Sequence, residues 1–179
     1  MSTARTQFVG YRVSGLPNNF KALSPIRFTI SEGNKRNKKP IKMQCSVKGD
    51  ACTNFKQADI KNGSYIEAAG VMEQFFHKGE FRTSWTLMDL SKQAEPNKIS
   101  RVNYGSDELP FDSITDTKRM SVARTQFVDY KVLGLPENYT NMSAIHFTIL
   151  EADPIPGKPP IKAQCSVKGT YNKEYAIQF

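Results

Sequence analysis

Cysteine and histidine are scarce in this chain of 179 residues, which has the cysteines Cys45, Cys52 and Cys165 and the histidines His77 and His146. An odd number of cysteines without a regular spacing argues against a secreted disulfide scaffold. A metal site needs several ligands close together, and the sequence has no such cluster. We therefore expect no metal and no cofactor, and we interpret Cys45 and Cys165 as buried thiols that act as small hydrophobic groups.

Long hydrophobic runs are also missing. A membrane-spanning helix needs roughly 18 or more apolar residues in a row, and no such run exists. The first ten residues, MSTARTQFVG, lack the apolar region of a secretory signal. Paired carboxylates, a nucleophile with its base and a phosphate-binding loop are likewise absent as motifs. We expect a cytoplasmic protein with no membrane partner and no enzymatic activity.

Acidic residues are fewer than basic ones: the chain has 25 Lys and Arg but 17 Asp and Glu, which gives a formal net charge of +8. The calculated isoelectric point is near 9.4. A basic surface attracts polyanions such as nucleic acids. An ordinary solvated surface is the alternative interpretation, and the net charge alone does not exclude it.

The chain contains an internal repeat. Residues Ala4–Val9 read ARTQFV, and Ala123–Val128 read the same, an offset of 119. Further along, Gln44–Gly49 and Gln164–Gly169 both read QCSVKG, an offset of 120. One residue has therefore been inserted in a loop of the second copy. The first copy continues for about forty residues after its QCSVKG, whereas the second stops soon after Gly169. We predict a complete domain over 1–90, a linker over 91–122 and a truncated copy over 123–179.

Alternating apolar and polar residues in the first copy predict five strands. Their predicted ranges are Phe8–Gly15, Ile26–Ile30, Ile41–Lys48, Ser64–Phe76 and Phe81–Leu90. A short helix is expected between Asp50 and Asn62. The order strand, strand, strand, helix, strand, strand is that of the OB-fold, a mainly all-β, five-stranded Greek-key barrel. An SH3-like barrel lacks a helix at that point, and a β-sandwich needs more strands. The second copy is expected to form a partial OB-like unit.

One segment resembles a known family. Residues 61–70, KNGSYIEAAG, resemble the start of strand four in bacterial single-stranded DNA-binding proteins. The hairpin Val71–Leu87 and the strand Ile41–Gly49 resemble the family's aromatic, basic hairpin and its third strand. The resemblance covers Phe8–Leu90, with a partial echo in Phe127–Gly169. It implies an OB-fold that binds single-stranded nucleic acid.

Binding of single strands without sequence preference needs cations along the phosphates and aromatic faces for unstacked bases. Both are present on the predicted third strand, on the loop before it and on the last hairpin. Trp85 could equally belong to the core, and either Phe75 or Phe76 must point outward from a regular strand. The predicted binding residues are Arg27, Lys35, Arg36, Lys38, Lys39, Lys42, Gln44, Lys48, Phe75, Phe76, Lys78, Arg82, Trp85, Lys162 and Lys168.

The sequence thus predicts a nonspecific single-stranded DNA-binding protein of replication, recombination or transfer. An RNA-binding OB protein and an OB-type protein interaction module are the alternatives. The short second copy cannot close a barrel and leaves edges that need covering. It could gain a strand from the C-terminal residues, pair with the first copy or another subunit, or belong to a truncated two-barrel protein. We expect a homodimer or higher homo-oligomer.

Overall fold

The computed structural model describes residues 1–33, 39–94 and 121–168. By their contacts the residues form two compact units, Ala4–Gln126 and Met1–Thr3 with Phe127–Phe179. The strand that begins at Val122 pairs with the first strand of the larger unit. The domain limits 1–90, 91–122 and 123–179 stay a prediction, and residues 95–120 of the predicted linker lie outside the described residues.

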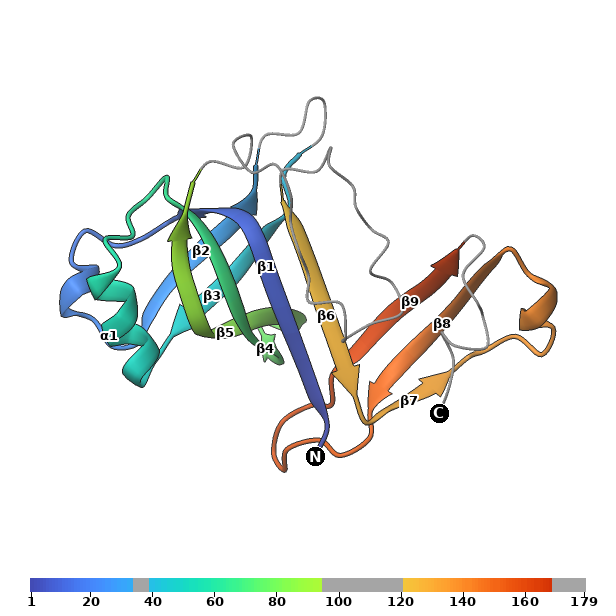
Figure 1. Cartoon of the computed structure of the whole chain (residues 1–179). Helices are drawn as coiled ribbons and strands as arrows, with labels where there is room; N and C mark the ends of the chain where they lie inside the picture. The colour runs from blue at the N-terminus through green and yellow to red at the C-terminus, as the bar shows by residue number, and fades with distance from the viewer. Residues whose placement is uncertain (34–38, 95–120, 169–179) are drawn as a thin grey trace. The chain divides into compact units, whose positions relative to one another are not determined.

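The larger unit is a barrel of five strands with an added sixth (Figure 1). Its elements are β1 Thr3–Ser14, η1 Phe20–Ala22, β2 Ile26–Glu32, β3 Lys42–Val47, α1 Gly49–Gln57, β4 Tyr65–His77, β5 Glu80–Gln93 and β6 Val122–Val128. The strand order is β2-β3-β5-β4-β1-β6, and an additional β1–β2 pairing closes the ring of the first five. β3 and β5 are parallel, and the other described pairs of the barrel are antiparallel. With α1 between β3 and β4, this is the OB-fold, as predicted.

Alternation along the strands fills the interior of the barrel. On β2, Ile26, Phe28 and Ile30 are buried whereas Arg27 is exposed. Helix α1 closes the interior with Phe55, whose ring lies 5.1 Å from that of Phe28. Alternation in the third strand predicts an inward row of Ile41, Met43, Cys45 and Val47; Cys45 and Val47 are buried, and Met43 packs on the core. Ile41 departs from it, because β3 begins one residue later and the Ile41 side chain is 54% exposed.

A close approach of two strands bends the barrel at Gly70. The β4–β5 register shifts between Ala69 and Gly70, where β5 carries one extra residue, the exposed Met88. A Cβ atom on Gly70 would lie only 2.4 Å from the carbonyl oxygen of Thr86. Only glycine fits such a position without movement of the backbone.

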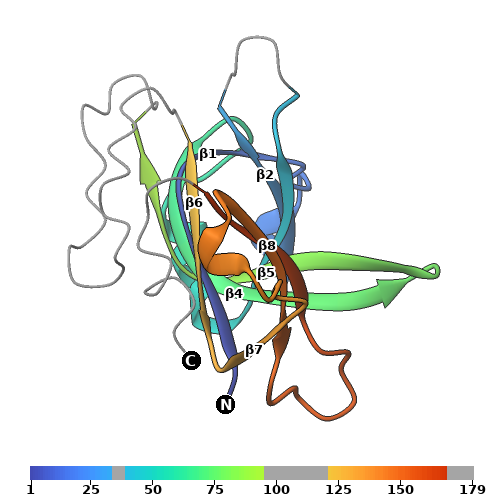
Figure 2. The same ribbon diagram turned by 90° about the vertical axis from the view of Figure 1, so that its right-hand side faces the viewer.

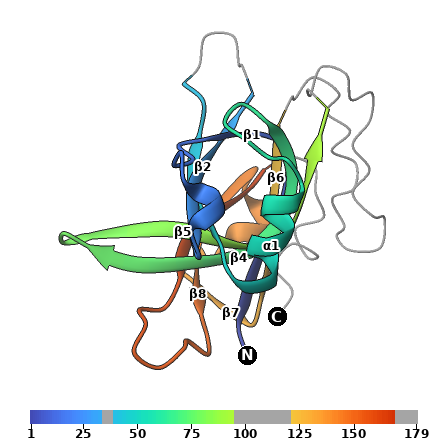
Figure 3. The same cartoon turned by 90° about the vertical axis from the view of Figure 1, so that its left-hand side faces the viewer.

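Beyond the bend, the β4–β5 hairpin projects out of the barrel (Figures 2 and 3). The two strands stay paired out to His77 and Glu80. Lys78 and Gly79 form the two-residue turn, and both have positive φ angles, 50° and 78°. That is the backbone of a type I′ turn, whose twist matches that of the strands it connects.

The smaller unit holds the rest of the second copy. It contains β7 Tyr130–Leu133, η3 Tyr139–Asn141, β8 Ala144–Glu151 and β9 Lys162–Lys168. Its three strands form an antiparallel sheet in the order β7-β8-β9, which is consistent with the partial OB-like unit expected for the second copy. Ile145, Ile149 and Ile161 are its buried apolar residues.

Among the described residues, no helix is both long enough and apolar enough to cross a membrane.

Candidate nucleic-acid interface

The exposed side of β2 and β3 carries two basic residues. The antiparallel register sets Arg27 opposite Ser46, Thr29 opposite Gln44 and Ser31 opposite Lys42. Arg27, Lys42 and Gln44 are exposed, whereas Cys45 and Val47 on the same β3 strand are buried. Alternation therefore puts the cations and the amide on one surface, as the sequence predicted.

The same surface continues across β5 and β4. The parallel pairing sets Gln44 beside Ser84 and Ser46 beside Thr86, so the even-numbered residues of this part of β5 share the side of Lys42. Arg82 follows on that side by alternation, and the register of the hairpin sets it opposite Phe75 of β4. We call this surface the outer face; its residues are Arg27, Thr29, Ser31, Lys42, Gln44, Ser46, Glu73, Phe75, Arg82, Ser84 and Thr86.

The outer face joins the two kinds of group that single-strand binding requires. Its cations are Arg27, Lys42 and Arg82, all exposed, and its aromatic ring is Phe75, which is 40% exposed. Glu73 is the one carboxylate of this face, and it lies next to Ser84 between the cations and the tip. The charge of the face is therefore positive, and its only ring lies at the end that reaches away from the barrel.

Both phenylalanines of the pair at 75 and 76 are exposed, whereas the sequence led us to expect that one would pack inward. Phe76 lies opposite Phe81 on the other side of the hairpin, and the two ring centroids are 4.0 Å apart. Their side chains are still 60% and 59% exposed. The reason is that the hairpin extends past the interior of the barrel, so its inner side has no layer to pack against. Lys78 is exposed in the turn beyond them.

Trp85 does not lie on the outer face. It pairs with Cys45, whose side chain points into the barrel, and it packs on the hydrophobic core. Its indole Nε1 donates a hydrogen bond to Thr6 Oγ1 at 2.9 Å, and its ring meets the ring of Phe8 edge-on at 5.8 Å. This position favours the alternative that Trp85 belongs to the core. We therefore leave Trp85 out of the candidate interface.

The other predicted residues are spread around the chain. Lys35, Arg36 and Lys38 lie outside the described residues, and Lys39 is exposed just after them. Lys48 is exposed at the start of α1. In the smaller unit, Lys162 and Lys168 are exposed on β9, in the positions equivalent to Lys42 and Lys48.

The two equivalent thiols were both predicted to be buried, but their burial in the structure differs. Cys45 is buried, and burial raises the pKa of its thiol to about 12. Cys165 is only half-buried, and burial also raises the pKa of its thiol. These groups belong to the interior faces of their sheets and do not contribute to the outer face.

Sequence reasoning missed the hydroxyl groups of Ser84 and Thr86 on the outer face, and it missed Phe81 as an exposed ring. The serine and threonine could have been found from the parallel pairing of strands three and five, which is a regular feature of the OB-fold. Phe81 lies within two residues of the turn, and a residue so close to a hairpin tip has little chance of reaching a core.

No protein-family model and no curated protein matches the chain. Among solved structures, it is similar to the mitochondrial single-stranded DNA-binding protein Rim1 of S. cerevisiae, with 12% identity and a TM-score of 0.43 over 52% of this chain and 97% of that chain. It is also similar to the small single-stranded DNA-binding protein of Streptomyces coelicolor, with 12% identity and a TM-score of 0.30 over 52% of this chain and 94% of that chain. At these TM-scores the likeness carries no argument about the ligand, and the OB-fold is assigned from the strand order.

Proposed function

We propose that this chain is a sequence-nonspecific single-stranded DNA-binding protein, without enzymatic activity, that acts in replication, recombination or transfer of DNA. One observation carries the proposal: the strand registers gather Arg27, Lys42, Arg82 and Phe75 on one continuous outer face. Those cations suit phosphates and that ring suits an unstacked base.

The chemistry of the face explains the preference for single strands. Each phosphate neutralised by a cation releases counterions, a gain that does not depend on sequence. Stacking of a base on an aromatic ring is also tolerant of sequence, because every base has a π-face. In a duplex the bases are already stacked on one another, so none is available to stack on the ring of Phe75. Gln44 and the hydroxyl groups beside it can donate hydrogen bonds to phosphate and sugar oxygens.

A salt titration with fluorescently labelled oligo-dT tests the proposal. If Arg27, Lys42 and Arg82 each neutralise one phosphate, log K should fall with log [salt] with a slope of roughly −2, since each contact to a single strand contributes about −0.7. Hairpin duplex DNA of equal charge is the control and should bind more weakly. Absence of binding at low salt would refute the function, and equally tight duplex binding would refute stacking. Oligo-rU in the same titration distinguishes DNA from RNA.

An OB-type protein interaction module is the second candidate. The observation in its favour is the exposed apolar pair Phe76 and Phe81, which lies on the opposite side of the hairpin from the cations. Exposed aromatic side chains that share a surface are typical of protein contact sites. The double variant Phe76→Ser with Phe81→Ser should leave binding of oligo-dT unchanged if the outer face is the nucleic-acid site. Loss of oligo-dT binding in that variant would mean that the nucleic-acid site lies on the side of Phe76 and Phe81, and it would refute the outer face as that site.

A further inference from the structure

The polar row of β3 recurs on β9 of the smaller unit. Exposed residues alternate along β9 with half-buried ones, as the period of a strand requires. The exposed residues are Lys162, Gln164, Ser166 and Lys168. At the offset of 120 residues they are equivalent to Lys42, Gln44, Ser46 and Lys48. The proposed function uses the row on β3 and leaves the row on β9 without a role.

The antiparallel registers of the small sheet extend this row across β8 and β7. They set His146 of β8 opposite Ser166, and they set Leu150 of β8 between Lys162 of β9 and Lys131 of β7. His146 and Lys131 are both exposed. The lysines therefore come from the two outer strands of the sheet, and the histidine comes from the central one. We call this surface the second face; its residues are Lys131, Leu133, His146, Thr148, Leu150, Lys162, Gln164, Ser166 and Lys168.

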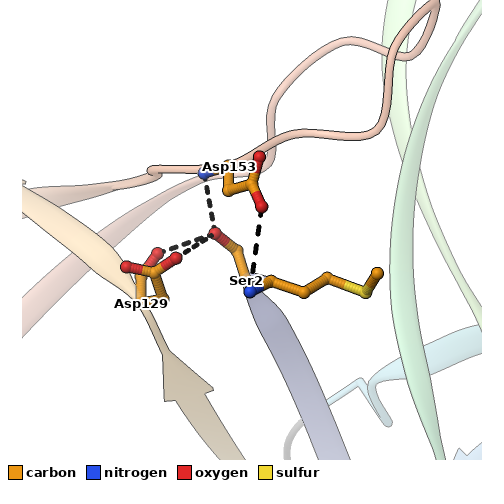
Figure 4. A network of polar contacts seen from close by, with 4 residues as sticks. Ser2, Asp129 and Asp153 are labelled. Atoms are coloured by element: carbon orange, nitrogen blue, oxygen red, sulfur yellow. Dashed lines mark hydrogen bonds and ion pairs between the residues drawn. The ribbon is translucent and has the colours of Figure 1, made fainter.

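The carboxylates next to the small sheet are engaged away from the second face (Figure 4). Asp129 precedes β7 and Asp153 follows β8, so both lie beyond one end of the sheet. Ser2 Oγ lies 3.2 Å from a carboxylate oxygen of Asp129, and the amine of Met1 lies 3.7 Å from the carboxylate of Asp153. Glu151, at the end of β8, accepts a hydrogen bond from a backbone N–H at 3.0 Å. Among the described residues, the second face therefore carries cations and no carboxylate.

The second face also lacks an aromatic ring within the described strands. The rings of the small sheet are those of Tyr130 and Phe147, and both lie on its other side, because Phe147 is opposite the half-buried Cys165 and Tyr130 alternates with the exposed Lys131. Cations without a ring contact only the phosphates, which single strands and duplexes both present. The second face therefore differs from the outer face, whose Phe75 favours unstacked bases.

We propose that the second face binds the phosphate backbone of nucleic acid and does not distinguish single strands from duplex. Its ligand is identified by charge: three exposed lysines and no carboxylate suit a polyanion. His146 stands where the first copy has Arg27, and histidine carries less positive charge than arginine at neutral pH, so the second face binds more weakly than the outer face. The class of ligand rests on the proposed function, but the surface and its selectivity are separate from it.

A salt titration of the full chain with long duplex DNA and with poly-dT tests the second face. Lys162→Ala with Lys168→Ala should make the slope of log K against log [salt] shallower by about 1.8 for the duplex and about 1.4 for poly-dT, since each lost contact contributes about 0.9 or 0.7. Lys21→Ala with Lys61→Ala is the matched control, because it removes the same charge from exposed residues of the larger unit. Equal slope changes in the two variants, or none in the first, would overturn the inference.

The second face and the proposed function can fail separately in this titration. A parent chain without preference for poly-dT over duplex contradicts the proposed function, yet the second face stands if the substitutions at Lys162 and Lys168 still reduce the duplex slope. A reduced slope for poly-dT alone would overturn the indifference to duplex. His146→Arg restores the cation of the first copy at an exposed position and should steepen the duplex slope by about 0.9. An unchanged slope in that variant would overturn the second face as a phosphate site.

Discussion

Phe75 offers the sharpest test of the outer face. Its ring is 40% exposed on the projecting hairpin, opposite Arg82 and on the side of the cations. Loss of one base stack costs about 1–3 kcal/mol, which corresponds to roughly 5- to 150-fold in the dissociation constant. Phe75→Ala should therefore weaken binding of oligo-dT by a factor in that range. The free energy of unfolding should change by no more than about 0.5 kcal/mol, because the ring lies outside the core.

The assay is fluorescence anisotropy of labelled oligo-dT, repeated over a range of salt concentrations. Removal of Phe75 should lower affinity at every concentration while the slope of log K against log [salt] stays the same, since no phosphate contact is lost. Intrinsic fluorescence is a poor reporter, because Trp85 is packed on the core and bonded to Thr6.

Phe76→Ala is the matched control, because it removes the same ring from the neighbouring position on the opposite side of the hairpin. Its affinity for oligo-dT should remain within about twofold of the parent protein. An equal or larger loss in the control, or unchanged binding in Phe75→Ala, would refute the assignment of the outer face. Chemical denaturation of both variants separates such a result from a loss of folding.

Three further outcomes are expected. Lys42→Ala and Arg82→Ala should each make the slope of log K against log [salt] shallower by about 0.7, whereas Lys61→Ala, an exposed lysine of another loop, should not; equal slopes in all three would exclude phosphate contacts on the outer face. Gly70→Ala should lower the free energy of unfolding by about 1–3 kcal/mol in a urea titration, because a Cβ there meets a backbone oxygen of β5 at 2.4 Å. Since burial raises the pKa of Cys45 to about 12, its thiol should react with a disulfide reagent at neutral pH only as fast as the protein unfolds, and rapid labelling of the native protein would contradict its burial.

Local pattern was enough for much of the barrel. Strict alternation in the third strand separated the inward Cys45 and Val47 from the outward Lys42 and Gln44, and this period of two is a property of any extended chain. A glycine inside a strand is typical of a close approach by another backbone, and Gly70 is such a residue. The position of one short helix between the third and fourth strands then identified the OB-fold, and the fold implies the order of the strands.

The exposure of the hairpin was beyond such reasoning. By alternation Phe81 and Trp85 lie on one side of β5, yet only Trp85 reaches the core. Whether other elements cover one side of a strand depends on how far the strand extends past them, and this is a property of the tertiary structure. The pairing of β1 with β6 was hidden for a related reason. The repeat identifies equivalent residues, but no local signal in either segment shows that the two strands meet.

The β1–β4 register shifts between Phe8 and Tyr11, and Gly10 in that segment is replaced by Asp129 in the second copy. Gly10 has a φ of 74°, and its counterpart Asp129 keeps the same left-handed backbone with a φ of 63°. Asp129 adds a carboxylate oxygen 3.2 Å from Ser2 Oγ, a contact that glycine cannot offer to Ser121, whose hydroxyl donates to the carbonyl oxygen of Gly10. When two identical chains associate, one mutation alters both halves of their contact at once. In a chain that carries both copies, each half can change separately, as Gly10 in the first copy and Asp129 in the second do here.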